Sequence, residues 1–384
     1  MLKKNINIIS SLIDYPKPKI DFGEYVFCME NFLAKHVDGV LYLSVDAGET
    51  YTKQIDITAV GNIRYIHIFQ NGELVVCGQT KAYYSLDWIT LNESTVLDIN
   101  GDPFVPAQYD NFYTHFTNPN RQIVNGVEVL CWGNYARYAP EQYNSINIWY
   151  TIDKGQTIKS CFKFGTSIAD GESSPLLCRH VHNVNFNPAD NTFWAQTGDE
   201  DRNLYSHWIK GVYDTAADSW TWTRIGSGDT YKTCMMHFIG DYIYYAWDHP
   251  NGGVCRRLYT NAHLPESQEQ LLQTPNDCIA LQIGERGDMV ALMSRFGGDS
   301  SARIIYYSPD GVNFYEVTGK VPANLDYSGA TYYNSWPPNS QGKVLSGIFC
   351  DNVVNIHDWD KKPSVWIDDL IKKAGFLDAF KPLD

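Results

Sequence analysis

Three segments of the sequence combine an apolar and aromatic strand pattern with the same turn residues. They read LYLSVDAGETYTKQIDI from Leu41, IWYTIDKGQTIKSCFKF from Ile148 and IIYYSPDGVNFYEV from Ile304. Alternating apolar and aromatic residues predict a β-strand in each, followed by Ser or Thr, then Asp, then Gly. Gly takes positive φ without steric cost and Asp accepts hydrogen bonds from turn N–H groups, so each segment predicts a hairpin. The turn residues are Ser44, Asp46, Gly48, Thr151, Asp153, Gly155, Ser308, Asp310 and Gly311.

A larger unit of strand, tight turn and strand repeats along the chain. Its spacing of roughly 45–60 residues is typical of the blades of a β-propeller. The recurring Asp turn then falls between the third and fourth strands of its unit. The predicted starts of the units are Ile63, Phe112, Arg179, Thr233, Cys278 and Ala330.

The two ends of the chain are predicted to complete each other. The unit from Ala330 lacks its own third and fourth strands, whereas Val40–Ile57 is a third-and-fourth pair without a first strand. Pairing them would remove two exposed sheet edges. The sequence therefore predicts an all-β, six-bladed propeller whose last blade is closed jointly by N- and C-terminal strands.

The expected organisation is an N-terminal extension (1–23), one propeller (24–360) and a C-terminal tail (361–384). The tail, PSVWIDDLIKKAGFLDAF, carries apolar residues at helical spacing. It predicts a short amphipathic C-terminal helix that covers the outside of a blade.

Composition excludes several classes of protein. The aromatic content of 14%, with 26 Tyr and 11 Trp, favours strands. The net charge of −14 and the lack of a basic cluster disfavour a nucleic-acid partner. None of the nine Cys forms a C-x-x-C pair, so buried free thiols made in a reducing compartment are expected. The broken apolar N-terminus predicts no signal peptide and no membrane insertion, hence cytoplasmic synthesis, with association to a virion as a further location.

The three turns resemble the Asp-box, or BNR repeat, of sialidase-like β-propellers. SVDAGETY, TIDKGQTI and the shorter SPDGVNF carry the resemblance, and HVHNVNFNPADNTFWAQTGDED is similar to a stretch of some bacterial Asp-box proteins of unassigned activity. The resemblance implies a propeller in which this turn is structural and lies opposite the active site. Families with this turn include sialidases, other glycosidases, polysaccharide lyases and binding modules. Sialidases carry an early Arg-Ile-Pro motif, but Arg64 here has no Pro after it, so a true sialidase is not expected.

Polar nitrogen-bearing side chains recur on the predicted first strands, which line the axis of a propeller. His180 and His182 are two residues apart and therefore share one face of a strand. Several imidazoles that converge on the axis could bind one divalent metal ion. Three histidines and a glutamine also resemble the metal site of one propeller family of pectate-type lyases. The alternative is that these side chains hydrogen-bond backbone or water in a polar channel. The candidate metal ligands are His67, His115, His180, His182, His237 and Gln282.

The loops after the second strands should open on the same face as the starts of the first strands. Two acids about 5–10 Å apart would suit glycoside hydrolysis. A His or Tyr base beside Arg would suit a lyase that removes a proton next to a uronate. Solvated turn acids and strand-core aromatics are the alternatives. The catalytic candidates are Asp199, Asp248 and His249, and the ligand-binding candidates are Tyr135, Arg137, Trp194, Trp247 and Arg295.

These observations lead to two hypotheses about function. The first is recognition or cleavage of a carbohydrate on the axial face, by a glycoside hydrolase or polysaccharide lyase if the protein is an enzyme. The second is a non-catalytic propeller that acts as an interaction, structural or receptor-binding module, for example of a phage tail. Protein partners would be expected if it belongs to a virion or another assembly.

Overall fold

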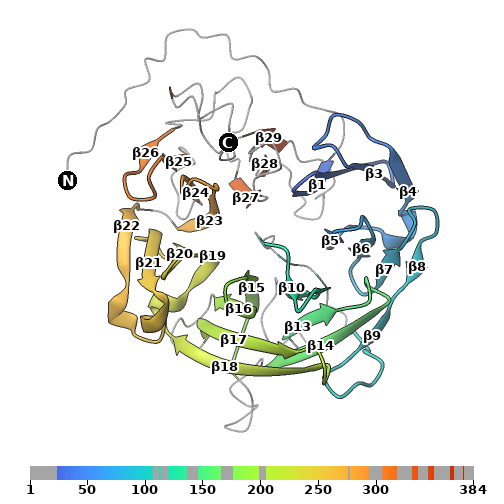
Figure 1. Ribbon diagram of the computed structural model, residues 1–384, viewed down its shortest axis with the longest axis horizontal. Coiled ribbons are helices and arrows are strands. Elements are labelled where there is room, and N and C mark those ends of the chain that lie inside the picture. The colour runs from blue at the N-terminus through green and yellow to red at the C-terminus, as the bar shows by residue number, and fades with distance from the viewer. Residues whose placement is uncertain are drawn as a thin grey trace.

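The protein is an all-β chain of short sheets whose strands are antiparallel, apart from the parallel pairing of β14 (Thr157–Phe164) with β9 (Thr95–Leu97) (Figure 1). The computed structural model describes residues 24–106, 112, 114, 120–135, 146–165, 176–198, 205–275, 277–293, 305–317, 331–335, 345–349, 364–366 and 375. Within these ranges the helical turns are the short 3-10 segments η1 (Thr58–Val60), η4 (Asp229–Tyr231), η5 (Tyr259–Asn261) and η6 (Pro265–Ser267). No helix in the same ranges is long and apolar enough to cross a membrane.

The first three sheets come from the N-terminal half of the chain. Sheet 1 contains β1 (Glu24–Met29), β2 (Phe32–Val37), β3 (Val40–Ser44) and β4 (Lys53–Asp56). Sheet 2 contains β5 (Tyr65–Ile68), β6 (Leu74–Cys77), β7 (Ala82–Ser85) and β8 (Asn92–Glu93). Sheet 3 contains, in spatial order, β12 (Leu130–Gly133), β13 (Ile146–Thr151), β14 (Thr157–Phe164) and β9 (Thr95–Leu97). A separate hairpin consists of β10 (Ile123–Val124) and β11 (Val127–Glu128).

The other four sheets follow in chain order. Sheet 4 contains β15 (His180–Asn187), β16 (Thr192–Gly198), β17 (His207–Asp214) and β18 (Ser219–Ser227). Sheet 5 contains β19 (Thr233–Ile239), β20 (Tyr242–Trp247), β21 (Gly253–Leu258) and β22 (Glu269–Gln273). Sheet 6 contains β23 (Cys278–Ile283), β24 (Met289–Met293), β25 (Ile305–Ser308) and β26 (Tyr315–Glu316). Sheet 7 contains β27 (Thr331–Ser335), β28 (Leu345–Phe349) and β29 (Ser364–Trp366).

The seven sheets lie around a common centre, each beside the next in the sequence (Figure 1). The innermost described strands β12, β15, β19, β23 and β27 contact one another in turn. This arrangement is propeller-like. Five inner strands, β5, β15, β19, β23 and β27, begin at or within two residues of the starts expected from the sequence. The start expected at Phe112 falls in a part of the chain of which the structure describes only residues 112 and 114.

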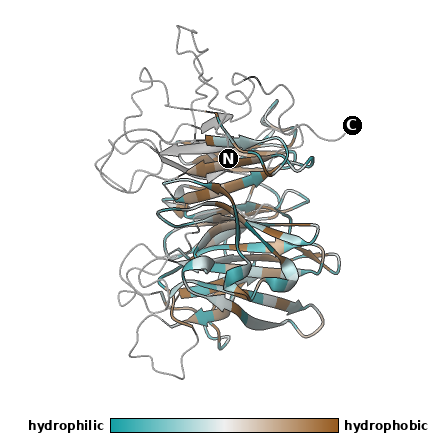
Figure 2. Ribbon diagram, turned by 90° about the vertical axis from the view of Figure 1, so that its left-hand side faces the viewer, coloured by the Kyte–Doolittle hydropathy of each residue, from teal (hydrophilic) through white to brown (hydrophobic). Residues whose placement is uncertain are grey.

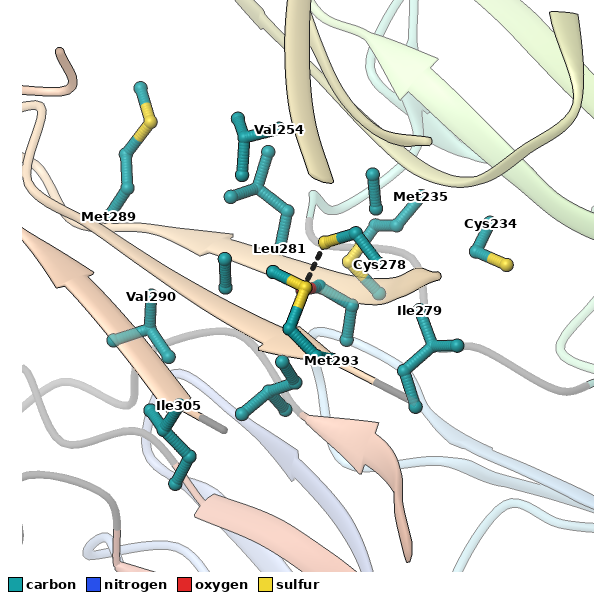
Figure 3. Close-up of a cluster of buried hydrophobic side chains, with 14 of the residues drawn as sticks. Cys234, Met235, Val254, Cys278, Ile279, Leu281, Met289, Val290, Met293 and Ile305 are labelled. Carbon is teal, nitrogen blue, oxygen red and sulfur yellow. Dashed lines mark hydrogen bonds between the residues drawn. The ribbon is translucent and has the colours of Figure 1, made fainter. Parts of the chain in front are cut away.

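The hydrophobic core lies between neighbouring sheets. Side chains of sheets 1 and 2, such as Leu41 and Ile68, form one cluster, and those of sheets 5 and 6, such as Met235 and Leu281, form another (Figure 3). Strands with a sheet on each face must be apolar on both faces, which explains runs such as Cys278–Ile283. Colouring by hydropathy accordingly shows hydrophobic residues along the strands (Figure 2).

The prediction that Val40–Ile57 pairs with the C-terminal unit is wrong. Strand β3 pairs with β2, and β2 pairs with β1, so Val40–Ser44 has its partners in the residues just before it. The alternating residues of Glu24–Met29 and Phe32–Val37 supply the first and second strands that the sequence analysis had not assigned. Sheet 1 is therefore complete in itself.

The C-terminal tail begins as a strand rather than as part of a helix. Val365 and Trp366 pair with Ser346 and Leu345 of β28, because a β-branched and an aromatic residue suit a strand at a sheet edge. The rest of the predicted helix, apart from Gly375, lies outside the described residues, as does the extension 1–23.

The Asp turns connect the strands that precede and follow them, and each is held together by its own side chains. In the first turn, Ser44 Oγ donates to Asp46 Oδ1 at 2.6 Å and accepts from the Gly48 N–H at 2.7 Å. Asp46 also accepts from the Thr50 N–H at 2.9 Å. The turns at Thr151 and Ser308 repeat the bond from the hydroxyl to the Asp, at 2.9 and 3.1 Å. These side chains therefore close their own turns by hydrogen bonds.

A fourth turn of this kind joins β7 to β8 and was missed in the sequence. Ser85 Oγ contacts Asp87 Oδ1 at 3.3 Å, and Asp87 accepts from the Thr90 N–H at 3.0 Å. Trp88 takes a positive φ of 65°, and Ala47, Lys154 and Gly311 also take positive φ at the same position, directly after the Asp. The signal was Ser-x-Asp-x-x-Thr, obscured because this turn contains no Gly.

Candidate functional site

The histidines of β15 lie at the end of the sheets opposite the Asp turns. In sheet 6 the start of β23, Cys278, pairs with the end of β24, whereas the Asp turn begins at Ser308, which pairs with the start of β24. Strands β15, β19 and β23 are neighbours. The starts of β15 and β19 are linked by the contact between His182 and Thr233. The start of β15 therefore belongs to the face opposite the Asp turn of sheet 6, and we call this end of the sheets the histidine face.

A β-bulge shapes the start of the inner strand in several sheets. The register between β15 and β16 shifts between Val181 and Asn183, which places His182 in the bulge. The register between β19 and β20 shifts in the same way around Cys234. Bulges re-aim side chains and are common beside functional sites. His182 and Cys234 therefore occupy equivalent positions in adjacent sheets.

Tyr135, His180 and His182 form a stack on this face. The ring of Tyr135, which follows β12, lies 3.9 Å from the ring of His180 at 17°. His180 Nε2 lies 3.1 Å from His182 Nε2. Both histidines are buried and Tyr135 is half-buried. The structure thus brings together three of the predicted site residues from sheets 3 and 4.

Sheet 5 adds charged groups to this stack. Asp248, directly after β20, has its Oδ2 3.8 Å from His182 Nε2 and 3.1 Å from Lys232 Nζ. Asp248 is buried, and its N–H donates to the carbonyl of Lys232 at 3.0 Å. Lys232 and Cys234 flank the first residue of β19 and were not predicted as site residues. In the sequence, only their position next to Thr233, the first residue of an inner strand, could have marked them as site residues.

The orientation of His182 follows from one hydrogen bond. Its Nδ1 lies 2.9 Å from the carbonyl oxygen of Thr233, which can only accept. The proton of a neutral His182 therefore sits on Nδ1, and the lone pair of Nε2 faces His180 and Asp248. Gly198 makes room for this ring, because a Cβ at residue 198 would lie 2.2 Å from His182 Cε1.

The other candidate metal ligands do not join this group. His67 Nε2 lies 3.4 Å from Glu128 Oε1, and burial lowers the pKa of His67. His237 Nε2 lies 2.7 Å from the Leu281 carbonyl, and burial lowers the pKa of His237 to about 4. Gln282 is buried, with Nε2 3.7 Å from Met235 Sδ. His115 lies outside the described residues.

The expectation that His67 and His237 share an axial metal ion with His180 and His182 is therefore corrected. Among the described residues, neither belongs to a cluster of three His, Cys, Asp or Glu side chains that could hold a metal ion; His182, Cys234 and Asp248 form such a cluster. The physical reason is that each imidazole already has a partner on a neighbouring element. The Leu281 carbonyl contacts His237, and the Glu128 carboxylate contacts His67.

The remaining catalytic and ligand-binding candidates fall into three groups: a residue buried in the core, a stacked pair at the end of β20, and residues that the structure does not describe. Trp194 is fully buried in a cluster with Trp208, so it is a core residue rather than a platform for a sugar. His249 stacks on Trp247 with ring centroids 4.4 Å apart, and its Nε2 lies 3.1 Å from Asp229 Oδ2. Asp199, Arg137 and Arg295 lie outside the described residues.

No family model matches the chain, and no curated protein matches it. Among solved structures, the chain is similar to the extracellular domain of a provisionally assigned one-component system from B. thetaiotaomicron (TM-score 0.45, 10% identity, 85% of this chain and 39% of the other). It is also similar to a prolyl endopeptidase (0.47, 10%, 86% and 45%). A third is a provisionally assigned 6-phosphogluconolactonase from Bacteroides fragilis (0.48, 12%, 90% and 94%). The chain spans less than half the length of the first two, and similarity at this level transfers no activity to it.

Proposed function

We propose that the protein recognises a carbohydrate on its histidine face. The observation that carries the proposal is the stack of Tyr135 on His180 beside the ion pair of Lys232 and Asp248. An aromatic ring offers an apolar surface to the face of a sugar, and imidazole, lysine and carboxylate groups suit its hydroxyl and acidic substituents. The lysine makes an acidic sugar the preferred class of ligand.

The fold is consistent with a ligand site on the histidine face. We take the seven sheets to close into one ring of Asp-box type, with sheet 7 beside sheet 1. Four sheets carry the hydrogen-bonded Ser/Thr-x-Asp turn, at Ser44, Ser85, Thr151 and Ser308. These turns satisfy their own polar groups, which leaves the opposite ends of the sheets for a ligand.

A glycan array with a matched pair of variants tests the proposal. Tyr135→Ala should lose binding of the acidic glycans that the wild type retains. Tyr315→Ala removes a half-buried tyrosine beside the Asp turn of sheet 6 and should bind as the wild type does. Failure of the wild-type protein to bind any glycan would overturn the proposal, as would equal binding by wild type and Tyr135→Ala.

Cleavage by elimination is a second candidate, favoured over hydrolysis by the state of Asp248. Its Oδ2 lies 3.1 Å from Lys232 Nζ, so this oxygen is engaged by the lysine rather than free to protonate a leaving group. In elimination, the His180 imidazole would remove the proton at C5 of a uronate, C4=C5 would form, and the C4–O bond would break. The Tyr135 hydroxyl would protonate the leaving oxygen, and solvent would return the proton from His180 to Tyr135.

The ultraviolet absorbance of the unsaturated product measures this reaction directly. Growth of the absorbance with uronate polymers, and its loss in His180→Ala, are the expected results. Glycan binding without any such product would remove the lyase reaction and leave the recognition function in place.

A further inference from the structure

Three side chains with metal-binding atoms meet between sheets 4 and 5. His182, Cys234 and Asp248 each offer one nitrogen, sulfur or oxygen atom, and these atoms lie within 4.8 Å of one another. Cys234 Sγ is 3.9 Å from His182 Nδ1, and Asp248 Oδ2 is 3.8 Å from His182 Nε2. All three residues are buried, with 2%, 4% and 5% of their surface exposed. The buried carboxylate of Asp248 is also paired with Lys232, so a metal ion would share it with that lysine.

The β-bulges supply a second, independent observation. The same bulge recurs at Val26 in sheet 1 and at Ile279 in sheet 6, where the residue is apolar. Among the sheets whose bulged residue the structure describes, sheet 4 has His182 at this position and sheet 5 has Cys234. The polar pair therefore replaces an apolar residue at two equivalent positions that face each other.

His182 makes the kind of hydrogen bond that orients a metal-binding histidine. Its Nδ1 donates to the Thr233 carbonyl, which directs the lone pair of Nε2 toward Asp248. Metal-bound histidines characteristically donate their other ring N–H to a carbonyl or carboxylate in this way. Trp208 Nε1 in turn donates to Thr233 Oγ1 at 3.1 Å, which anchors that residue.

The donor set selects the class of metal. Imidazole, thiolate and carboxylate together suit zinc and similar transition metals, whereas Ca²⁺ and Mg²⁺ take oxygen ligands. Donors of a tetrahedral zinc ion are about 3.3–3.8 Å apart, since the metal–ligand bonds are about 2.0–2.3 Å. The distance of 3.8 Å between Asp248 Oδ2 and His182 Nε2 needs only a small contraction to reach this spacing. Three protein ligands would leave one position open, on the side where His180 Nε2 lies 3.1 Å from His182 Nε2.

We propose that His182, Cys234 and Asp248 bind one divalent transition metal ion of the zinc class between sheets 4 and 5. The site is independent of whether a glycan binds to the histidine face. Lys232 belongs to its surroundings, because its ammonium group lies 3.1 Å from Asp248 Oδ2 and competes with the metal for the carboxylate charge.

Cobalt(II) provides the sharpest test, since a thiolate bound to Co²⁺ gives a charge-transfer band in the near ultraviolet. The full-length protein is stripped with a chelator and titrated with Co²⁺ alone. One equivalent should produce the band, and Zn²⁺ should then remove it by displacement. Cys234→Ser should abolish the band, whereas Cys278→Ser, which alters a buried thiol at the start of the next inner strand, should keep it.

Affinity measurements complete the test. His182→Ala should weaken Zn²⁺ binding by more than the roughly 10–100-fold that loss of an outer-shell partner costs. Lys232→Met removes the competing charge at similar length and should strengthen binding. If Cys234→Ser does not fold, the concentration-dependent rise in melting temperature of the wild type with Zn²⁺ still reports binding. Absence of a cobalt band with no thermal shift, or equal loss of the band in Cys278→Ser, would overturn the site.

Discussion

Asp residues of the recurring turns form hydrogen bonds within their own turns. Asp153 Oδ1 accepts from Thr151 Oγ1 and from the Thr157 N–H, both at 2.9 Å. These bonds join the end of β13 to the start of β14 and satisfy donors that the ladder cannot reach. We therefore expect these Asp residues to contribute to stability and not to the ligand binding proposed for the histidine face, because the turns lie at the opposite end of the sheets.

Asp153→Ala should destabilise the fold without affecting ligand or metal binding. Loss of the acceptor leaves turn donors unsatisfied, which costs on the order of 1–3 kcal/mol in the free energy of unfolding. Urea denaturation measures this loss, and glycan and Co²⁺ binding are measured below the transition. Loss of binding with an unchanged unfolding midpoint would contradict the structural role.

Asp46 makes the same type of turn sensitive to acid. Hydrogen bonds from Ser44 and Thr50 lower the pKa of Asp46 to about 2, whereas a free Asp titrates near 3.9. Because the pKa is lower in the folded state, the stabilisation is complete above about pH 4 and is lost as the pH falls toward 2. The melting temperature of the wild type should therefore fall more steeply in this window than that of Asp46→Asn. Parallel curves for the two proteins would count against the assignment.

A comparison of Gly155 with Gly101 distinguishes the cost of backbone strain from the cost of overpacking. Its φ is +86°, and a Cβ would lie 1.9 Å from Val75 Cγ2 of sheet 2, whereas Gly101 has φ +85° with nothing within 4 Å. Both Ala variants force a left-handed conformation, costing roughly 1–2 kcal/mol. Gly155→Ala should cost a further 1–3 kcal/mol, approximately, through overpacking. Equal unfolding midpoints for the two variants would show that sheet 2 does not press on this turn.

At the scale of elements, the hairpin β10–β11 ties three sheets together through Glu128. This carboxylate accepts from Arg121 Nη1 and from the Gln70 N–H, both at 2.9 Å, and lies 3.3 Å from Lys154 Nζ of the turn in sheet 3. Arg121 also reaches Glu30 in sheet 1 at 3.0 Å. Burial would raise the pKa of Glu128, but contacts with His67, Gln70 and Arg121 lower it to about 2. A buried ionised group thus connects sheets that share no ladder.

Glu128→Gln should be far more costly than the same change in an exposed ion pair. Removing one partner leaves Arg121 with less compensation for its burial, which costs about 3–5 kcal/mol. Glu93→Gln is the control, since its pair with Lys81 is more than half exposed on both sides and exposed pairs contribute less than about 1 kcal/mol. Thermal and urea unfolding of both variants measure the difference. Similar stabilities would mean that the hairpin is not tied through Glu128.

At the scale of the whole molecule, sheet 1 is a required neighbour of sheet 2. Phe27, Leu41 and Leu43 share a cluster with Ile68 and Leu74 of sheet 2. Deletion of residues 1–57 should expose this apolar face and abolish soluble folding. Size-exclusion chromatography and thermal melts of the truncated chain measure the outcome. A monomeric truncation that melts cooperatively would show that sheet 2 does not need this contact.

Strand periodicity and turn chemistry were readable along the chain because both are local. The alternation in Ile148–Thr151 and the Ser-x-Asp-x-Gly turn at Ser44 depend on neighbours within a few residues. They predicted the strands, the hairpins and the all-β class. They also led to a wrong pairing of Val40–Ser44 with the C-terminal unit, since periodicity does not say which strand is the partner.

The candidate site divides in the same way. Two histidines on one strand face are a property of the sequence, and His180 and His182 do lie together. Cys234 and Lys232 join them only because sheet 5 packs against sheet 4 and a bulge turns each inner strand at its second or third residue. His237 meets the Leu281 carbonyl because sheet 6 packs against sheet 5, although its sequence context resembles that of the other histidines. The sequence by itself determined which residues form strands and turns, because those preferences act over a few bonds. The tertiary structure decided which side chains meet, because contacts between sheets join residues about fifty positions apart, a separation at which no local pattern is transmitted.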